Sequence, residues 1–354
     1  MHAPVELNLE LTPHARVDVI DVHHRAGERA ACLSAFPKAL YCSFHTTAGY
    51  LEPGLAARLT RSDVRIKPYL QIFRTLFPEA AGYRHDEMHL RGDLTDDERR
   101  VEPHNADAHL AFIAAGLQSC VKYTNRPQAP VYFIDLDGVV GKAPRRRTTS
   151  ILAFNTEEVA FRRRAYVPVS SHALESVSLK QPAFGLYDEL REQIAREGIT
   201  KGRVHIALAP GEHEVGLTVN EYETLLMRHD LADALRDPFR FVAEEGRHLL
   251  AEPRAIARKT LDHSKYDLVR VFNRTFDALD LKESLIEKLL ARLIAIPARR
   301  FLRMKRSVSL LISDRETPGR GVIAEGRYQC PILVQWQKAE RQQRALDVTV
   351  TRLC

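Results

Sequence analysis

The sequence predicts an α+β protein whose sheets are mixed or largely antiparallel. Short runs of alternating apolar residues predict strands, and the first of them places Leu40, Cys42 and Phe44 on one side. Glycines and the pair Asp137-Gly138 supply turn signals between such strands. A chain of 354 residues is long enough for two domains with separate cores. We therefore expect one domain at 1–165 and another at 170–354.

The composition is that of an ordinary globular protein. Hydrophobic residues make up 45% of the chain and charged residues 28%, which is typical of soluble domains. No apolar run approaches membrane-spanning length, and the first residues show no secretory signal. The five cysteines are odd in number and form no C-x-x-C pair. Free thiols in a reducing compartment fit this pattern, so we expect a cytoplasmic protein without a membrane partner.

The net charge of +6 is modest and unevenly distributed. Arginine runs at 145–147 and 162–164 and a basic stretch at 254–306 concentrate the excess. Such an excess can attract nucleic acid or phosphorylated small molecules. No zinc-finger spacing, RNP motif or basic zipper accompanies it. A solvated basic face is therefore the favoured interpretation, and nucleic acid is not the expected partner.

In the first half, the strand at 39–44 ends at His45-Thr46-Thr47. Hydroxyls that flank an imidazole can bind phosphate or position a proton carrier. The polar stretch 81–102, which contains His85 and His89, predicts a long loop of the kind that is usually functional or mobile. The other expected elements of this half are a helix at 66–77 that ends at Pro78 and strands at 130–135 and 150–154.

The second half is expected to begin after a basic linker at 162–169. An insertion follows at about 238–306, where Asp280 can cap a helix with an apolar stripe at 285–293. We interpret that stripe as core or interface packing. The other expected elements are helices at 187–196 and 223–235 and strands at 204–208, 307–312, 332–335 and 346–351.

The stretch 102–116 predicts a loop that carries polar groups into a short helix. Asn105 or Asp107 can cap the helix, and Gly116 suits its C-terminal end. Asn105 and His109 are four residues apart and share one face, with His104 at the same end. Such a helix start can bind an anion through its free N–H groups, or a metal through imidazole and carboxylate. The alternative is a capped helix whose histidines are satisfied by the protein.

Motifs spread along both halves point to one family. In the first half they are His45-Thr46-Thr47-Ala48-Gly49, His104-Asn105-Ala106-Asp107-Ala108-His109-Leu110, and Pro130-Val131 leading to Gly138 and Gly141. In the second half they are Gly198-Ile199 to Gly202, Gly216-Leu217-Thr218-Val219-Asn220-Glu221, and Gly326-Arg327-Tyr328-Gln329. Each half resembles the YjbQ-like family, often described as secondary thiamine-phosphate synthases. The repeated resemblance implies a tandem duplication with a helical insertion in the second copy.

The two copies depart from the family pattern in complementary places. The first has Pro53-Gly54 where the family has Asn-Glu, whereas the second keeps Asn220-Glu221. The second has Glu212-His213-Glu214 in place of His-Thr-Thr and lacks the His-Asn-x-Asp-x-His helix. The family's late Trp-Gln pair corresponds to Tyr328-Gln329 in the second copy, and we align Ala143-Pro144 of the first copy with it. These losses predict one composite site per chain, and the alternative is a degenerate scaffold.

The resemblance gives the predicted site its members. The expected catalytic groups are His45, His104, Asp107, His109 and Glu221. The expected substrate-binding groups are Thr46, Thr47, Arg99, Asn105, Asn220, Tyr328 and Gln329. His45, His104 and His109 could bind a divalent metal, because imidazole suits Zn or Mn. Alternatively, one imidazole moves a proton while hydroxyls, amides and the helix N-terminus hold phosphate oxygens.

The resemblance also implies a function. It implies a transferase acting on a phosphorylated or pyrophosphorylated small molecule, with Mg²⁺ as the partner of a pyrophosphate leaving group. It further implies a homo-oligomer, for which a trimer of tandem chains is favoured. Two other classes stay open at this point. One is a metal-dependent hydrolase or lyase using the same histidines, and the other is a non-catalytic module that binds a ligand or nucleic acid.

Overall fold

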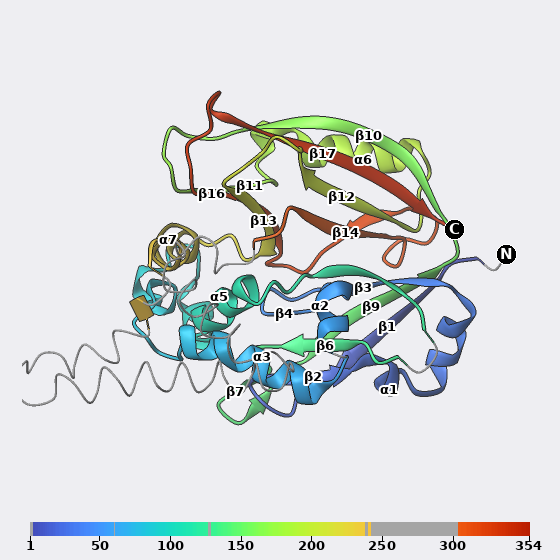
Figure 1. Ribbon diagram of the computed structural model, residues 1–354, viewed down its shortest axis with the longest axis horizontal. Helices are drawn as coiled ribbons and strands as arrows, with labels where there is room; N and C mark the ends of the chain where they lie inside the picture. Colours follow the sequence, from blue (N-terminus) through green and yellow to red (C-terminus); the bar gives the residue numbers. More distant parts are fainter. Residues whose placement is uncertain (1–2, 60, 127–128, 238–239, 242–303) are drawn as a thin grey trace, which may run out of the picture. The chain divides into compact units, whose positions relative to one another are not determined.

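The computed structural model describes residues 3–59, 61–126, 129–237, 240–241 and 304–354 (Figure 1). The chain falls into two compact units. The larger unit comprises residues 1–54, 116–222 and 304–354, and the smaller unit comprises residues 55–115 and 223–303. Each half of the sequence contributes to both units. The predicted apolar stripe at 285–293 and nearly all of the predicted insertion lie outside the described residues.

The first strand set of the larger unit contains a four-stranded antiparallel sheet in the order β1-β9-β3-β5. Its strands are β1 (Val5–Leu11), β9 (Arg147–Phe154), β3 (Lys38–Ser43) and β5 (Cys120–Thr124). A smaller sheet has the order β2-β6-β4, with β2 (Asp18–Asp21), β6 (Tyr132–Asp135) and β4 (Ala48–Gly49). Leu7, Leu9 and Leu11 alternate into the core from β1, as the period of a strand requires.

A second strand set repeats this order. Its large sheet runs β10-β17-β12-β14 (Figure 1), and β15 is added at the edge beside β14. The strands are β10 (Glu157–Pro168), β17 (Gln343–Leu353), β12 (Gly202–Leu208), β14 (Ser307–Ser313) and β15 (Val322–Ala324). Its small sheet, β11-β16-β13, consists of β11 (Glu175–Ser178), β16 (Cys330–Gln335) and β13 (Val215–Asn220). If the four shared strands of each large sheet are numbered along the chain, both sheets have the strand order 1-4-2-3.

Hydrogen bonds outside the sheets match position by position between the two sets. The N–H of Ser43 donates to Ser119 O at 2.7 Å, and that of Leu208 donates to Arg306 O at 2.8 Å. Four further bonds of the first set have counterparts in the second. The bond from Leu136 N to Thr47 O corresponds to that from Trp336 N to Glu214 O, and the bond from Val22 N to Val131 O corresponds to that from Leu179 N to Pro331 O. The two reciprocal bonds between Tyr50 and Gln118 correspond to the two between Leu217 and Lys305. Position 131 of the first set thus corresponds to position 331 of the second, so Ala129 is the equivalent of Gln329. The sequence alignment of Ala143-Pro144 with Tyr328-Gln329 is therefore corrected.

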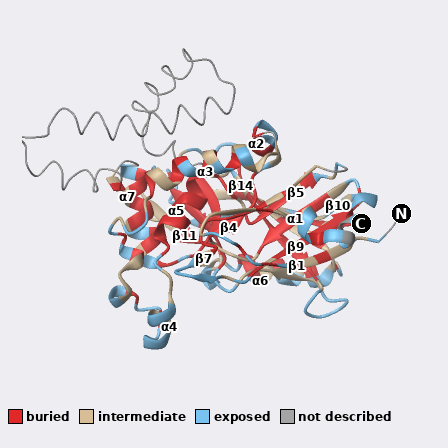
Figure 2. Ribbon diagram, turned by 90° about the horizontal axis from the view of Figure 1, so that it is seen from below, coloured by how far each residue is buried: buried red, intermediate tan, exposed pale blue. Residues whose placement is uncertain are grey.

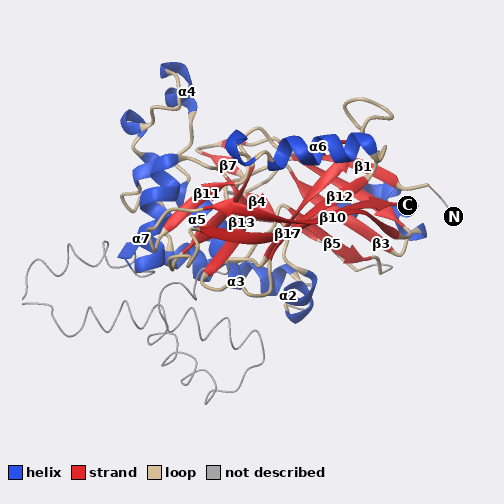
Figure 3. Cartoon of the chain, turned by 90° about the horizontal axis from the view of Figure 1, so that it is seen from above, coloured by secondary structure: helices blue, strands red, loops and turns tan. Residues whose placement is uncertain are grey.

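The remaining elements of the larger unit are short or cover the sheets. They are α1 (Val22–Ala26), the 3-10 helices η1 (Gly27–Ala35) and η4 (Pro182–Phe184), the two-stranded ribbon of β7 (Val139–Val140) and β8 (Ala143–Pro144), and α6 (Leu186–Arg196). Helix α6 packs its apolar face, with Leu186, Leu190 and Ile194, into the core of the second set (Figure 3). A separate apolar cluster joins the sets, because Leu311 and Leu353 pack with residues of β3, β5 and β9.

The predicted basic linker at 162–169 is instead part of β10, the longest strand of the second set. Its arginines tolerate this position because both charges are paired: Arg164 lies on the exposed side and pairs with Asp347, whereas Arg163 lies on the side of Ala165 and Val167 and pairs with Glu189 of α6. Ala165 and Val167 supply the buried side. Local polarity therefore concealed a strand whose pairing with β17 runs over its full length. The predicted boundary at 165–170 overlaps the end of this strand at Pro168.

The smaller unit is helical in its described residues. It contains α3 (Asp63–Leu76), α4 (Asp96–Val101), α5 (Ala106–Ala114), the π-helical turn η5 (Leu226–Asp230) and α7 (Leu231–Arg236). The chain enters it through α2 (Pro53–Arg58). The predicted loop at 81–102 is replaced by the 3-10 helices η2 (Arg84–Asp86) and η3 (Met88–Leu90) and by α4. All of α5 is buried, whereas α4 is exposed (Figure 2).

Two further observations concern the described residues only. No helix among them combines the length and apolar character needed to cross a membrane. All five cysteines lie among them, and none forms a disulfide.

Gly326 offers a test of how the two strand sets pack. A Cβ added at this glycine would lie 1.8 Å from Phe44 O, so Gly326→Ala should lower the free energy of unfolding by about 1–3 kcal/mol. Gly211→Ala is the matched control, because its Cβ would meet nothing within 4 Å; we expect a change within about 0.5 kcal/mol. Chemical denaturation measures both. Equal stability of the two variants would contradict the close approach.

Candidate functional site

A buried polar cluster in the smaller unit centres on His85, whose side chain is 0% exposed. Its Nδ1 lies 3.2 Å from Glu223 Oε2, and its Nε2 lies 3.3 Å from Asn105 Oδ1. The ring of His109 meets the His85 ring edge to face, with centroids 5.2 Å apart. Two imidazoles, an amide and a carboxylate are thus held together away from solvent. We call His85, Asn105, His109 and Glu223 the imidazole cluster.

The start of α5 places two members of this cluster. Asn105 is the N-cap residue, but its side chain does not cap the helix. Asp86 does so instead, since its Oδ1 accepts the N–H of Ala106 at 3.1 Å. The Asn105 amide is thereby available to His85, and His109 stands one turn along the same face. The prediction that Asn105 and His109 share a face is confirmed, and Gly116 ends the helix with a φ of 68°.

Two carboxylates from the second half of the sequence fix His85. Asp230 accepts the N–H groups of Arg84 and His85, both at 2.9 Å. Burial raises the pKa of Asp230 to about 6, although these two bonds oppose the shift. Burial would also raise the pKa of Glu223, but bonds from His85 and from two backbone N–H groups outweigh it and lower that pKa. Glu223 is therefore ionised at neutral pH.

Arg91 supplies a positive charge beside these carboxylates and is only 1% exposed. Its guanidinium binds Asp93 through two bonds at 2.9 and 2.8 Å, and its Nη1 lies 3.1 Å from His85 Nδ1. The side chain of Arg99 donates twice to Arg91 O, at 3.0 and 2.9 Å. Arg99 was predicted to bind substrate, and in this structure it anchors the backbone that carries Arg91.

The sequence missed half of this cluster. His85 was noted only as part of a polar loop, and Glu223 was not singled out, because no local spacing connects positions 138 residues apart. The polar loop rich in histidine ahead of α5 was the available signal. Of the other predicted members, His104 is exposed and Asp107 is buried in the first turn of α5.

His45 belongs to the larger unit, between β3 and β4. Its Nε2 accepts the N–H of Thr148 at 2.8 Å, so the ring proton resides on Nδ1. Burial, and then the charges of Arg147 and Arg145, lower the pKa of His45 to about 3. The ring is a neutral donor of fixed tautomer. This arrangement suits a hydrogen bond to an anion, and it does not favour the predicted role of His45 as a metal ligand, since its acceptor nitrogen is already used.

The neighbours of His45 include three further predicted residues. Asn220 Nδ2 donates to Thr46 O at 3.2 Å, and Gln329 Nε2 donates to His45 O at 3.0 Å. Thr47 Oγ1 accepts a bond from the guanidinium of Arg147 at 3.4 Å. Residues of the two strand sets thus meet at this loop.

The last two predicted residues also lie in the larger unit. Tyr328 is 44% exposed, with the Arg327 guanidinium 5.0 Å from its ring centroid. Glu221 is buried. That Glu221 and the His45 loop share one cavity with His109, which belongs to the smaller unit, stays a prediction.

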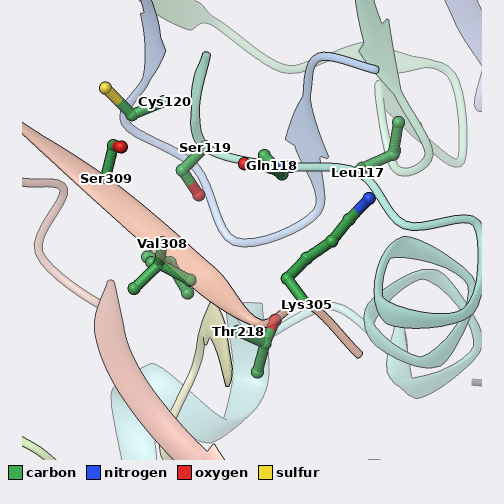
Figure 4. Close-up of a pocket in the computed structure, with 9 residues that line it drawn as sticks. Leu117, Gln118, Ser119, Cys120, Thr218, Lys305, Val308 and Ser309 are labelled. Carbon is green, nitrogen blue, oxygen red and sulfur yellow. The ribbon is translucent and has the colours of Figure 1, made fainter. Parts of the chain in front are cut away.

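A small cavity in the larger unit is not a substrate pocket. It has a volume of about 10 Å³ and is lined by residues 117–120 together with Thr218, Lys305 and Ser309 (Figure 4). That space holds no more than one water molecule. The buried hydroxyl of Ser119, which has no hydrogen-bond partner among the described residues, is suited to bind it.

Comparison with known proteins yields structures only. No protein-family model matches the chain, and no curated protein matches it. A YbjQ-like protein of unknown function from Sulfolobus solfataricus P2 is 17% identical; the match covers 56% of this chain and 99% of that one, with a TM-score of 0.29. An uncharacterised conserved protein of the yjbq/upf0047 family from Clostridium acetobutylicum is 19% identical, over 41% of this chain and 97% of its own, with a TM-score of 0.25.

About half of the chain is thus similar to YjbQ-like proteins. A hypothetical protein from Aeropyrum pernix K1 gives a comparable match, 13% identical over 53% of this chain and 96% of that one, with a TM-score of 0.27. The expected resemblance to YjbQ-like proteins is therefore found among solved structures. Because these TM-scores are low, the chemistry of the site rests on the residues of this chain alone.

The protonation of His45 can be measured directly. Nuclear magnetic resonance of the imidazole nitrogens should show a neutral ring with the proton on Nδ1 from pH 7 down to about pH 4, because its pKa is about 3. Unfolded His45 takes up a proton near its ordinary value of 6.5. Between these values the unfolded chain binds more protons, so this group lowers the free energy of unfolding as pH falls from 6.5 towards 3. Titration near 6.5 in the folded protein would contradict the described contacts.

Proposed function

We propose that the protein is an enzyme that binds a divalent metal at His85 and His109 and acts on a phosphorylated or pyrophosphorylated small molecule. The observation that carries this proposal is the pair of buried imidazoles, one of which is backed by an ionised carboxylate. Fully buried histidines with such a partner are costly to maintain unless they are satisfied or used. A carboxylate that receives one ring N–H while the other nitrogen faces inward is the usual support of a metal-binding histidine.

The donor set fits a divalent transition metal. Imidazole nitrogens, with carboxylate and amide oxygens nearby, suit Zn²⁺ or Mn²⁺ better than Ca²⁺, which prefers oxygen ligands alone. With Nδ1 of His85 directed at Glu223, Nε2 is the nitrogen that would hold the ion, together with His109. Such an ion would stabilise the negative charge that develops on a departing phosphate or pyrophosphate.

The residues themselves perform the supporting tasks. Glu223 Oε2 and Arg91 Nη1 lie 3.2 and 3.1 Å from His85 Nδ1 and fix the orientation of the ring, and Asp230 holds the backbone of η2. The side-chain amide of Asn105, beside His85 Nε2, can accept or donate a hydrogen bond to a ligand, because either its oxygen or its nitrogen can face that ligand. In the larger unit, the neutral Nδ1–H of His45 and the hydroxyl of Thr46 are suited to donate to phosphate oxygens.

The assembly of the chain is also part of this proposal. The identical strand order and the matching hydrogen bonds of the two strand sets support a tandem duplication. A homo-oligomer, with a trimer of tandem chains favoured, is proposed from the family resemblance, and light scattering at micromolar concentration tests it.

A transferase is distinguished from a hydrolase or lyase by its need for a second substrate.

Metal content tests the proposed site. Protein purified without chelators should carry a divalent metal, and His85→Ala or His109→Ala should remove it, because each deletes a ligand. Glu223→Gln should weaken binding by about 10–100-fold by disturbing the support of His85. The matched control is His89→Ala, since His89 lies in the adjoining 3-10 helix and its side chain is 75% exposed.

The metal content, measured by mass spectrometry, and the rate of phosphate or pyrophosphate release should then fall together in the ligand variants. The control should leave both unchanged. Metal content that is equal in wild type, His109→Ala and His89→Ala would contradict the proposed site.

A further inference from the structure

Amide side chains of the second strand set hold the loop that carries His45. Gln329 Nε2 donates to Ser43 O at 2.9 Å and to His45 O at 3.0 Å, so both of its protons are used. Its Oε1 accepts the N–H of Gly326 at 3.0 Å, which fixes the amide within its own set. Asn220 acts in the same way: Nδ2 donates to Thr46 O, and Oδ1 accepts the N–H of Glu221 at 2.8 Å.

We propose that Gln329 and Asn220 are positioning residues, through which the second strand set holds the His45 loop of the first in its donor geometry. Both side chains are buried, Gln329 at 4% exposure and Asn220 at 0%. A buried amide whose hydrogen-bonding groups are bound to backbone has little freedom to move, and neither does the backbone it binds. Gln329 and Asn220 would therefore act on a ligand of this loop through His45, and their predicted role in binding substrate directly stays a prediction.

Among the described residues, the positions that correspond to Gln329 and Asn220 in the first set make no equivalent contact to the second set. Matching hydrogen bonds place Ala129 at the position of Gln329, and Pro53 at the position of Asn220. Neither side chain has a donor, so these two positions give the first set, in the part of the chain that the structure describes, no equivalent contact to the loop 209–214 of the second set. The complementary losses of the sequence follow from this arrangement. The second set keeps the amides because the loop they hold is in the first set.

The loop of the second set is instead occupied by its own side chains. Glu212 accepts a bond from Arg344 Nη1 at 3.0 Å and another from the N–H of Ala345 at 2.7 Å. Glu214 accepts the indole N–H of Trp336. No imidazole is held there, because His213 is exposed. One loop of this kind, the His45 loop, is therefore presented by each chain.

The experiment compares two variants that remove the same kind of contact. Gln335 is the control, because its Nε2 also bridges two backbone carbonyls, Ser170 O at 3.5 Å and His172 O at 2.8 Å, within the second set. Its Oε1 accepts Arg344 Nε at 3.1 Å, so Gln335→Met removes at least as many contacts as Gln329→Met but none to the His45 loop. Gln329→Met and Gln335→Met each keep side-chain length and lose the donor. Hydrogen exchange of the Thr148 amide, which donates to His45 Nε2, and the titration of the His45 imidazole are measured in both, without any ligand.

We expect Gln329→Met to speed exchange of the Thr148 amide by about tenfold, as loss of these hydrogen bonds frees the loop, and to move the His45 pKa from about 3 towards 6.5. Gln335→Met should change neither.

No change in Gln329→Met, or equal changes in both variants, would overturn the proposal. If Gln329→Met does not fold, Asn220→Asp replaces the donor to Thr46 O with a carboxylate oxygen, which cannot donate. Unchanged Thr148 exchange in that variant would overturn it as well. Because no metal or substrate enters the measurement, its result is independent of the proposed function.

Discussion

A single buried guanidinium holds each strand set of the larger unit together. Arg147 donates to Asp135 through Nε at 2.6 Å and Nη2 at 2.9 Å, and Nη2 also reaches Asp137 O at 2.6 Å. Through Thr47 it also reaches the loop that carries His45. The last strand, the end of β6 and the loop are thus fixed by one side chain. Removing one partner of such a buried pair typically costs about 3–5 kcal/mol, because the other charge remains buried.

Arg344 has the corresponding role in the second set, but its carboxylate partner comes from a different part of the chain. Its Nε donates to Gln335 Oε1 at 3.1 Å, at the position where the first set has Asp135. The charge that balances it is Glu212, which comes from the loop itself. This exchange of a strand carboxylate for a loop carboxylate preserves the ion pair and ties the loop down. The difference between a loop that presents an imidazole and one that is filled therefore follows from where the guanidinium finds its partner.

The sequence predicts those parts of the structure that depend on local pattern. Alternation located β3, β6 and β12, and the cap and glycine signals located α5. β10 was missed because three consecutive arginines conceal a strand that is covered on one side only. The partners of His85 were missed because Glu223 and Asp230 reach it from the other half of the chain. Periodicity and motif spacing carry no information about such long-range contacts, and pairing in three dimensions decides them.

Metal binding is assigned here to His85 and His109, and anion binding to the His45 loop, and anomalous diffraction tests this assignment most directly. Crystals grown with Zn²⁺ or Mn²⁺ should show an anomalous peak about 2.0–2.2 Å from ring nitrogens of His85 and His109. No peak should lie at His45, whose acceptor nitrogen is bound to Thr148, or at the loop 209–214. A metal bound to His45, or the absence of a peak at the two buried imidazoles in metal-loaded crystals, would contradict it.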